Sequence, residues 1–226
     1  KTPGRTQSIN VFEISKKINI IDLPGYGFAK VSKVMRGRLI ILIEDYIQYR
    51  KKLDYIFLLI DAKVGIKGSD IDMLDFLRAI KKKYKPTRIL NIGDEIDGHA
   101  ISYHSPNPDL ASAGDELKKA VRVIHELEEI FPKMDLVHSN HGSLVFRKAL
   151  THGLPKAFIK DYNDFLQVGK GWKWHEDIII RASNGQDIYF CHGKSANILK
   201  LGQQYGMNVV QGHYHTKFAV HYWGIP

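Results

Sequence analysis

The sequence predicts an α/β fold, because short apolar strands alternate with amphipathic helices along most of the chain. Two further observations favour the same class. Hydrophobic residues make up 44% of the 226 residues and charged residues 25%, which is typical of a globular protein rather than a disordered one. Polar side chains also gather directly after several of the apolar segments, which is where α/β proteins place their functional sites.

The first predicted elements lie between residues 9 and 50. Residues 9–14 alternate apolar and polar side chains, and residues 18–22 are mostly apolar, so we expect two strands joined by a short turn. A loop rich in proline and glycine follows at residues 23–27. Apolar residues at helical spacing then predict a helix from about residue 33 to residue 50.

The alternation of strands and helices continues through the rest of the chain. Residues 55–61 form a continuous apolar run that ends in Asp61, which is typical of a buried parallel strand. A helix is expected to begin at Ser69-Asp70 and to run through Ile80. The remaining expected elements are strands at 88–94, 134–138, 178–181, 187–191 and 208–211, and a helix at about 113–130.

Several classes of protein are excluded by the composition. The longest apolar runs are far shorter than the roughly 18 residues that a membrane-spanning helix needs. Cys191 is the single cysteine, so the chain cannot form an internal disulfide. The first residues also lack the apolar segment of a secretory signal. We therefore expect a soluble protein of the cytoplasm that has no membrane partner.

The net charge of +9 is concentrated in the first part of the sequence. Residues 1–90 hold 19 Lys and Arg against 9 Asp and Glu, whereas residues 91–226 hold 14 against 15. All eleven histidines follow residue 98. The basic half, with its Lys81-Lys82-Lys83 run, is expected to suit a nucleic acid or a ribosome as partner. Such different halves indicate a composite chain.

Side chains that commonly bind metals follow five of the expected strands. Carboxylate, amide and imidazole groups are the donors that hard and borderline divalent cations prefer. Adjacent glycines allow the backbone to turn sharply at such positions. The segments are Asp61, Gly93-Asp94-Glu95-Ile96-Asp97, Ser139-Asn140-His141-Gly142, His192-Gly193 and Gly212-His213-Tyr214-His215.

In their order these segments resemble the motifs of the calcineurin-like metallophosphoesterases of the phage type, over about residues 74–226. The resemblance implies a metallophosphoesterase-like sandwich in which two divalent ions (Mn, Fe, Zn or Ni) hydrolyse a phosphate-ester substrate. It assigns the metal ligands as Asp61, Asp94, Asn140, His192, His213 and His215. It also makes His141 the catalytic acid or leaving-group contact, and Asp97 a carboxylate that orients an imidazole.

The first motif departs from this family. Asp61-Ala62-Lys63 places an ammonium where the family has a ligand imidazole, and a protonated lysine cannot bind a metal. The resemblance therefore implies a phosphoesterase that is impaired at its first metal position.

A second resemblance covers residues 1 to about 77, which are similar to the EngB-type ribosome-assembly GTPases. Thr2-Pro3-Gly4-Arg5-Thr6-Gln7 and Asp22-Leu23-Pro24-Gly25 carry it. By this resemblance Thr6 would touch magnesium, and Asp22 with Gly25 would sense the γ-phosphate. The sequence contains no Gly-x-x-x-x-Gly-Lys-Ser/Thr loop and no base-recognition motif, so we expect that GTP with Mg²⁺ is an unlikely ligand.

Together these patterns predict a chimeric chain. A partial GTPase-like (P-loop NTPase type) segment at 1–54 would precede a metallophosphoesterase-like domain at 55–226, and the two would share the strand and helix at 55–80. The expected function is that of an enzyme, a metal-dependent phosphoesterase. The alternatives are a fragment of a ribosome-assembly GTP-binding protein and an inactive composite scaffold.

Overall fold

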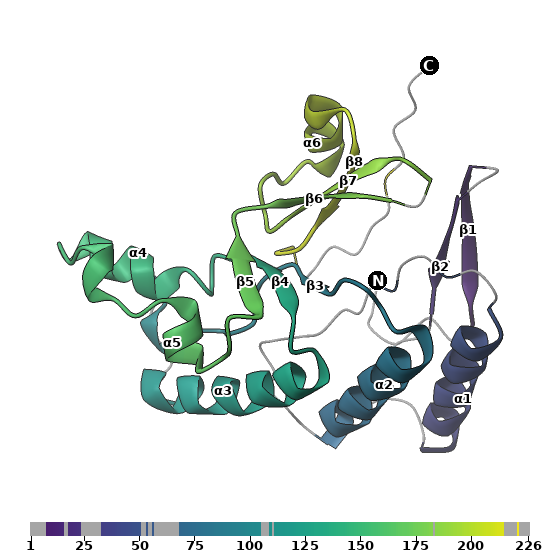
Figure 1. The fold of residues 1–226 in the computed structure, drawn as a ribbon, viewed down its shortest axis with the longest axis horizontal. Coiled ribbons are helices and arrows are strands. Elements are labelled where there is room, and N and C mark those ends of the chain that lie inside the picture. Colours follow the sequence, from purple (N-terminus) through teal and green to yellow (C-terminus); the bar gives the residue numbers. More distant parts are fainter. Residues whose placement is uncertain are drawn as a thin grey trace. The chain divides into compact units, whose positions relative to one another are not determined.

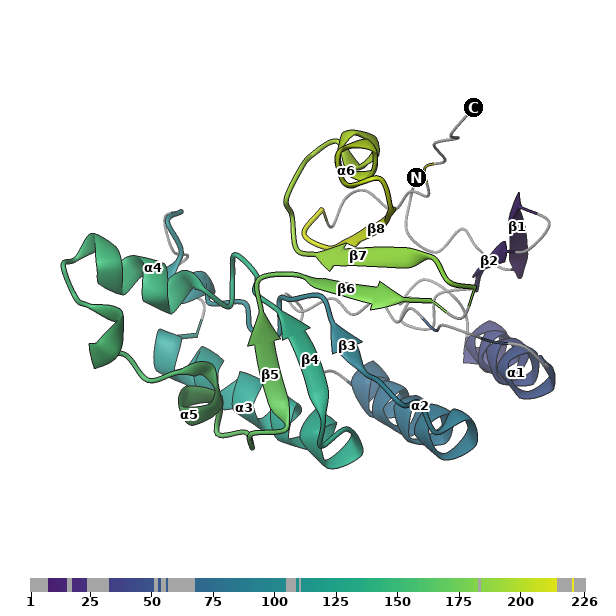
Figure 2. The same cartoon turned by 45° about the horizontal axis from the view of Figure 1, so that its top comes forward.

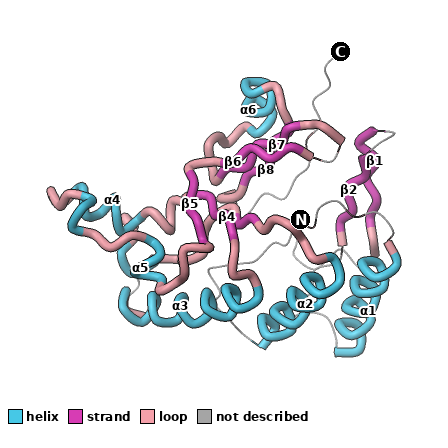
Figure 3. The backbone as a smooth tube through the Cα atoms, viewed as in Figure 1, coloured by secondary structure: helices cyan, strands magenta, loops and turns pink. Residues whose placement is uncertain are grey.

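The computed structural model describes residues 8–15, 18–23, 33–50, 53, 56, 68–104, 109, 111–182, 184–214 and 221 (Figure 1). The chain separates into two units, Lys1–Leu59 and Ile60–Pro226. Helices and strands occur in both units (Figure 3), so the expected α/β class is confirmed at the level of a mixed α/β fold.

The first unit contains a hairpin and one long helix. Strand β1 (Asn10–Ser15) pairs antiparallel with β2 (Ile18–Asp22), and this register places Asn10 opposite Asp22. Helix α1 (Lys33–Tyr49) then follows. It buries Leu39, Ile43 and Ile47, which lie four residues apart and therefore share one helix face.

The second unit is built on two three-stranded sheets (Figure 2). In the first sheet β3 (Leu90–Asn91), β4 (Met134–Val137) and β5 (Trp172–His175) run parallel, with β4 in the centre. In the second sheet β6 (Ile178–Arg181) runs antiparallel to β7 (Asp187–Cys191), and β7 runs parallel to β8 (Asn208–Gln211). The carboxyl ends of β3 and β4 therefore lie at one edge, as do those of β7 and β8.

Helices connect the strands of the second unit. They are α2 (Gly68–Tyr84), α3 (Ala113–Ile130), α4 (Leu144–Thr151), α5 (Tyr162–Leu166) and α6 (Ile198–Tyr205), with 3-10 turns η1 (His99–Ile101) and η2 (Lys156–Phe158). Ser112 caps the start of helix α3, because its side chain accepts a hydrogen bond from the Asp115 amide and so satisfies one of the free amides of the first turn. It buries Val121, Ile124 and Ile130.

Strand β7 connects the two layers of the hydrophobic core, because its alternate side chains point to opposite faces. Phe190 packs with Val137 of β4 and Ile178 of β6, which joins the two sheets. Tyr189 and Cys191 face the other way and pack against Leu201 of α6. These six side chains are all nearly fully buried.

Some expectations about the fold need correction. The metallophosphoesterase-like sandwich is not shown, because the described strands form separate sheets of two, three and three strands. The expected strand at 88–94 is only Leu90–Asn91, because Gly93 and Asp94 have φ values of 100° and 60°, which no strand can contain. The apolar run at 55–61 lies, except for Ile56, outside the described residues. The sequence patterns do not predict the helices α4, α5 and α6, the strand β5, or the two 3-10 turns.

No helix in the described part of the chain is both long and apolar enough to cross a bilayer.

The start of β5 approaches the preceding backbone so closely that only glycine fits. The Met134 amide donates to the Gly171 carbonyl at 3.0 Å, and a Cβ on Gly171 would lie 2.0 Å from the Pro132 carbonyl oxygen. We predict that Gly171→Ala lowers the free energy of unfolding by about 1–3 kcal/mol, because backbone atoms must move apart to admit the methyl group. Urea unfolding followed by circular dichroism measures the loss.

Gly114→Ala is the matched control, since Gly114 lies in α3 and its nearest neighbour to an added Cβ is the Ser112 hydroxyl at 3.9 Å. This variant should be unchanged or slightly more stable, because alanine is the better helix former. Equal unfolding free energies for both variants would contradict the account.

Candidate functional site

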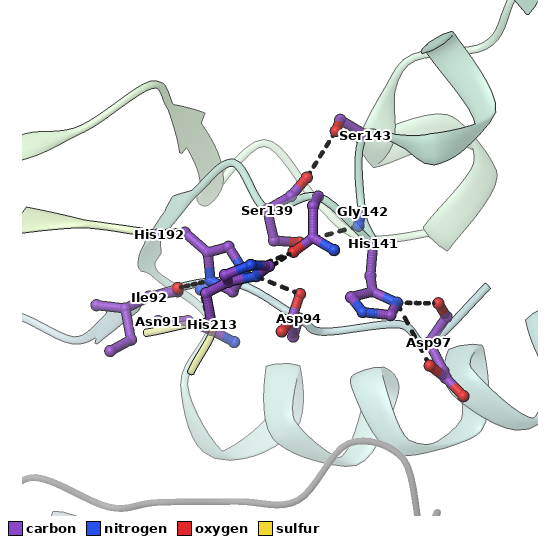
Figure 4. A network of polar contacts seen from close by, with 12 residues as sticks. Asn91, Ile92, Asp94, Asp97, Ser139, His141, Gly142, Ser143, His192 and His213 are labelled. Carbon is purple, nitrogen blue, oxygen red and sulfur yellow. Dashed lines mark hydrogen bonds and ion pairs between the residues drawn. The ribbon is translucent and has the colours of Figure 1, made fainter. Parts of the chain in front are cut away.

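Four strand ends of the second unit place polar side chains in one cluster (Figure 4). Asp94 follows β3, Asn140 follows β4, His192 follows β7 and His213 follows β8. We call these four residues the Asn140 cluster. They lie together because the carboxyl ends of neighbouring parallel strands meet at one edge of a sheet.

The Asn140 side chain is the centre of this cluster. Its Oδ1 lies 2.9 Å from His192 Nε2 and 2.8 Å from His213 Nδ1. The two imidazole rings meet edge to face, with centroids 5.2 Å apart. His192 Nε2 also lies 3.3 Å from Asp94 Oδ1, and the side chains of His192 and Asp94 are 2% and 10% exposed. Side chains from loops that follow three different strands thus meet at one amide oxygen.

The tautomer of His192 follows from its other ring nitrogen. His192 Nδ1 lies 2.7 Å from the Ile92 carbonyl oxygen, which can only accept, so Nδ1 carries a proton. Burial lowers the pKa of His192, although the Asp94 carboxylate opposes this effect, so the neutral ring is favoured. In that neutral ring Nε2 has a lone pair, and it faces Asn140 Oδ1 and Asp94 Oδ1. Three electron-rich atoms converge, which suits a hydrogen-bond donor or a positive charge.

Left-handed backbone at the strand ends makes this convergence possible. Gly93 and Asp94 after β3, and His213 after β8, have φ values of 100°, 60° and 77°. The Asn91 side chain accepts a hydrogen bond from the Gly93 amide at 2.8 Å and so supports the first turn. A Cβ on Gly93 would lie 2.7 Å from both His192 Nδ1 and Ser139 Cβ. The glycine is therefore required for close approach as well as for its backbone angle.

The loop at 139–143 has its own network of hydrogen bonds. Ser139 is 4% exposed, and its Oγ accepts from the Gly142 amide at 2.9 Å. The Ser143 hydroxyl donates to the Ser139 carbonyl oxygen at 2.6 Å. A Cβ on Gly142 would lie 2.7 Å from Glu95 Oε1. Ser139 and Gly142 thus have structural roles of their own in this loop.

His141 and Asp97, the expected catalytic pair, are also brought together. His141 Nδ1 contacts the backbone carbonyl oxygen of Asp97 and lies 3.3 Å from its Oδ1. Both side chains are about a third exposed (Figure 4). The hydrogen-bond partner of the His141 ring is thus the Asp97 backbone carbonyl, with the carboxylate beside it, and the expected roles of both residues stay predictions.

Glu95 is a residue that the sequence patterns did not single out. Its Oε1 accepts from Trp174 Nε1 at 3.0 Å, and within the described chain its buried Oε2 has no hydrogen-bond partner. Burial raises the pKa of Glu95, so its neutral form is favoured. The Trp174 ring stacks on Tyr162 with centroids 4.8 Å apart. A carboxyl group between two motif aspartates, next to an aromatic stack, could be found only from the tertiary fold.

The remaining expected site residues divide between the two units. Asp22 is the last residue of β2, and its Oδ2 accepts from Asn10 Nδ2 at 3.3 Å. Thr6, Gly25, Asp61, Lys63 and His215 lie outside the described residues. Of the six expected metal ligands, the structure therefore brings four together, and their assignment as ligands stays a prediction.

Comparison with known proteins places the similarity in the basic half of the chain. Residues 1–92 match the family described as 50S ribosome-binding GTPase. The chain is similar to proteins named probable GTP-binding protein EngB. The one from Mycoplasmopsis synoviae (strain 53) is 43% identical over 84 residues. Those from Neisseria meningitidis serogroup C (strain 053442) and Neisseria gonorrhoeae (strain NCCP11945) are 49% and 47% identical over 76 residues.

These matches cover 37% of this chain for the first relative and 34% for the other two. They cover 45% of the first relative and 36% of the other two, so the chain spans less than half the length of the curated relatives it matches. No solved structure matches the chain.

These findings correct the expected function. The metal-dependent phosphoesterase is wrong as the main prediction, because the family that matches is a GTPase family, and the calcineurin-like resemblance has no support. The two divalent ions are wrong as well, because in the described parts of the chain no group of three or more His, Cys, Asp or Glu side chains is placed to hold a metal. The physical reason is that Asp94 and His192 approach each other, whereas no third His, Cys, Asp or Glu side chain of the described residues is placed to complete a metal site with them.

The expectation against GTP and Mg²⁺ is also wrong, since the relatives are GTP-binding proteins. It relied on a missing phosphate-binding loop. In a chain that spans less than half of its relatives, that absence excludes nothing.

Substitution of Gly93 tests the close packing around His192. We predict that Gly93→Ala lowers the free energy of unfolding by about 2–4 kcal/mol, because left-handed strain and a clash with His192 and Ser139 add together. The control is Gly153→Ala, where φ is 76° and nothing lies within 4 Å of an added Cβ. This control should lose only about 1–2 kcal/mol, from backbone strain. Equal losses in urea unfolding would show that the clash does not exist.

Proposed function

We propose that residues 1–92 belong to a GTP-binding protein of the EngB type, which binds and hydrolyses GTP and acts on the large ribosomal subunit. The observation that carries this proposal is the match of these residues to a 50S ribosome-binding GTPase family, together with identities of 43–49% to proteins named as probable GTP-binding proteins. The activity of the whole protein and its partners are parts of the same proposal.

The hairpin of the first unit supports this function. Asp22 ends β2 and precedes Leu23-Pro24-Gly25, so its carboxylate lies where a strand gives way to a loop. Asn10, directly opposite in β1, donates to Asp22 Oδ2 and fixes the orientation of the carboxylate. A carboxylate held at the end of a strand can accept hydrogen bonds from water bound to a magnesium ion. In this proposal Asp22 does so beside the γ-phosphate, with Thr6 and Gly25 as its partners.

A basic surface supports the ribosomal partner. Lys81, Lys82 and Lys83 occupy the last turn of α2 and are exposed. Cations are favoured at the carboxyl end of a helix, so these three lysines destabilise the fold little. Residues 1–90 as a whole carry ten more basic than acidic residues. Such a balance favours the phosphate backbone of RNA as a contact surface.

Asp22→Ala tests the nucleotide site. We predict that the chain binds fluorescent GTP saturably in the presence of Mg²⁺, and that Asp22→Ala weakens this binding by about tenfold or more, because a hydrogen bond to a charged group contributes about 1.5–3 kcal/mol. Asp45→Ala is the matched control, since Asp45 is an exposed carboxylate of α1 in the same unit.

Two results would contradict the proposal. One is the absence of saturable GTP binding, and the other is an equal loss of affinity in the Asp22 and Asp45 variants. Co-sedimentation with purified 50S subunits, with and without GTP, tests the ribosomal partner separately.

A further inference from the structure

We propose that an exposed basic and aromatic surface of the second unit binds single-stranded nucleic acid. We call it the α4 surface, and it consists of the exposed residues Tyr103, Arg147, Lys156, Phe158 and Lys160 and the half-buried Lys148. The turn η2, which contains Lys156 and Phe158, contacts α4. It lies beyond residues 1–92, which are the residues that match the GTPase family, so the proposal does not depend on GTP binding.

The charge of this surface is strongly one-sided. Residues 142–160 contain four Lys and Arg and no Asp or Glu, although residues 91–226 as a whole hold 14 basic against 15 acidic residues. The acidic residue that follows, Asp161, caps α5 by accepting from the Asp164 amide at 2.9 Å. The basic groups of the α4 surface are therefore concentrated locally, where a polyanion would be attracted.

Exposed aromatic rings lie among these cations. Tyr103 is 54% exposed and Phe158 is 75% exposed, which is unusual for large apolar rings. Lys148 Nζ lies 4.3 Å from the centroid of the Tyr103 ring, and Arg147 Cζ lies 5.5 Å from it. Rings on which bases stack, set among cations that neutralise phosphates, are the two parts that single-strand binding sites combine.

Arg147 is held in place by a hydrogen bond within the protein. One of its guanidinium nitrogens donates to the Asn140 carbonyl oxygen, in the loop that follows β4. Lys156 Nζ lies 5.7 Å from the centroid of the Phe146 ring, so it too is held near an aromatic face. A surface whose cations are ordered in advance loses less entropy when it binds a strand.

A single strand fits this surface better than a duplex or a membrane. Stacking on Tyr103 and Phe158 requires unpaired bases, because a duplex hides their faces. Helix α4 has eight residues and buries Leu144 and Ala149 in the fold, and Leu150, 59% exposed, is its one large apolar side chain in solvent, which is a small area to insert into a lipid layer. An acidic peptide would use the cations but would leave the exposed rings without a role.

Fluorescence anisotropy with a labelled oligouridine of about 12 nucleotides tests the proposal. The chain should bind, with an affinity that falls as salt is raised. Tyr103→Ala should weaken binding by about fivefold or more, whereas Tyr103→Phe, which keeps the ring, should stay within about twofold. Lys148→Ala should weaken binding and reduce the salt dependence, while Lys200→Ala, an exposed lysine in α6, should do neither.

Several outcomes would overturn the proposal. They are an absence of oligouridine binding, equal affinities for Tyr103→Ala and Tyr103→Phe, and equal effects of Lys148→Ala and Lys200→Ala. Equally tight binding of a duplex of the same length would show that bases do not stack on the surface. Binding to anionic vesicles without binding to RNA would assign the surface to a membrane instead. Circular dichroism of each variant shows whether it is folded. If Tyr103→Ala is unfolded, the comparison of Lys148→Ala with Lys200→Ala still tests the proposal.

Discussion

The second unit depends on one amide oxygen. Asn140 Oδ1 can accept a hydrogen bond from His213 Nδ1 at 2.8 Å, and this contact connects the loop after β4 to the end of β8. His192 reaches in the other direction to the Ile92 carbonyl oxygen beside β3. The two sheets share no strand, so they are joined by this polar contact and by the apolar packing of Val137, Ile178 and Phe190. This close approach of the loops also explains Gly93, which has a left-handed backbone and leaves room for His192 because it lacks a Cβ.

The elements with strong patterns could be predicted from the sequence, and some others were missed for identifiable reasons. The sequence predicts the helix at 113–130 at the residues where it occurs, because its apolar stripe is long. Helix α6 was missed although Asn197 caps its start and Gly206, with φ of 64°, ends it. Helix α6 has a signal at each end, but its eight residues give only about two turns of hydrophobic periodicity. A pattern that short does not distinguish a helix from a loop. Strand β5 was missed because its pairing with β4, rather than its own composition, makes it a strand.

The candidate site could be located from the sequence more easily than it could be interpreted. Parallel strands bring their carboxyl ends together, so Asp94, Asn140, His192 and His213 were expected to be neighbours, as they are. The chemistry of the site does not follow from the residue types alone. Imidazole and amide groups at one place can bind a common ligand, or they can form hydrogen bonds with one another. Only the histidine tautomers and the distances between the atoms distinguish these two arrangements. Residues 1–27 carried a more reliable signal, because their motifs are contiguous in the sequence and match a GTPase family.

A double-mutant cycle between Asn140 and His213 tests most directly whether the amide oxygen holds the second unit together. The free energies of unfolding of the unmodified chain, Asn140→Ala, His213→Ala and the double variant would be measured in urea. If the contact joins the strand ends as described, the two substitutions are coupled by about 1 kcal/mol or more, because the second one removes a bond that the first has already broken. Free energies that add to within about 0.3 kcal/mol would contradict this account.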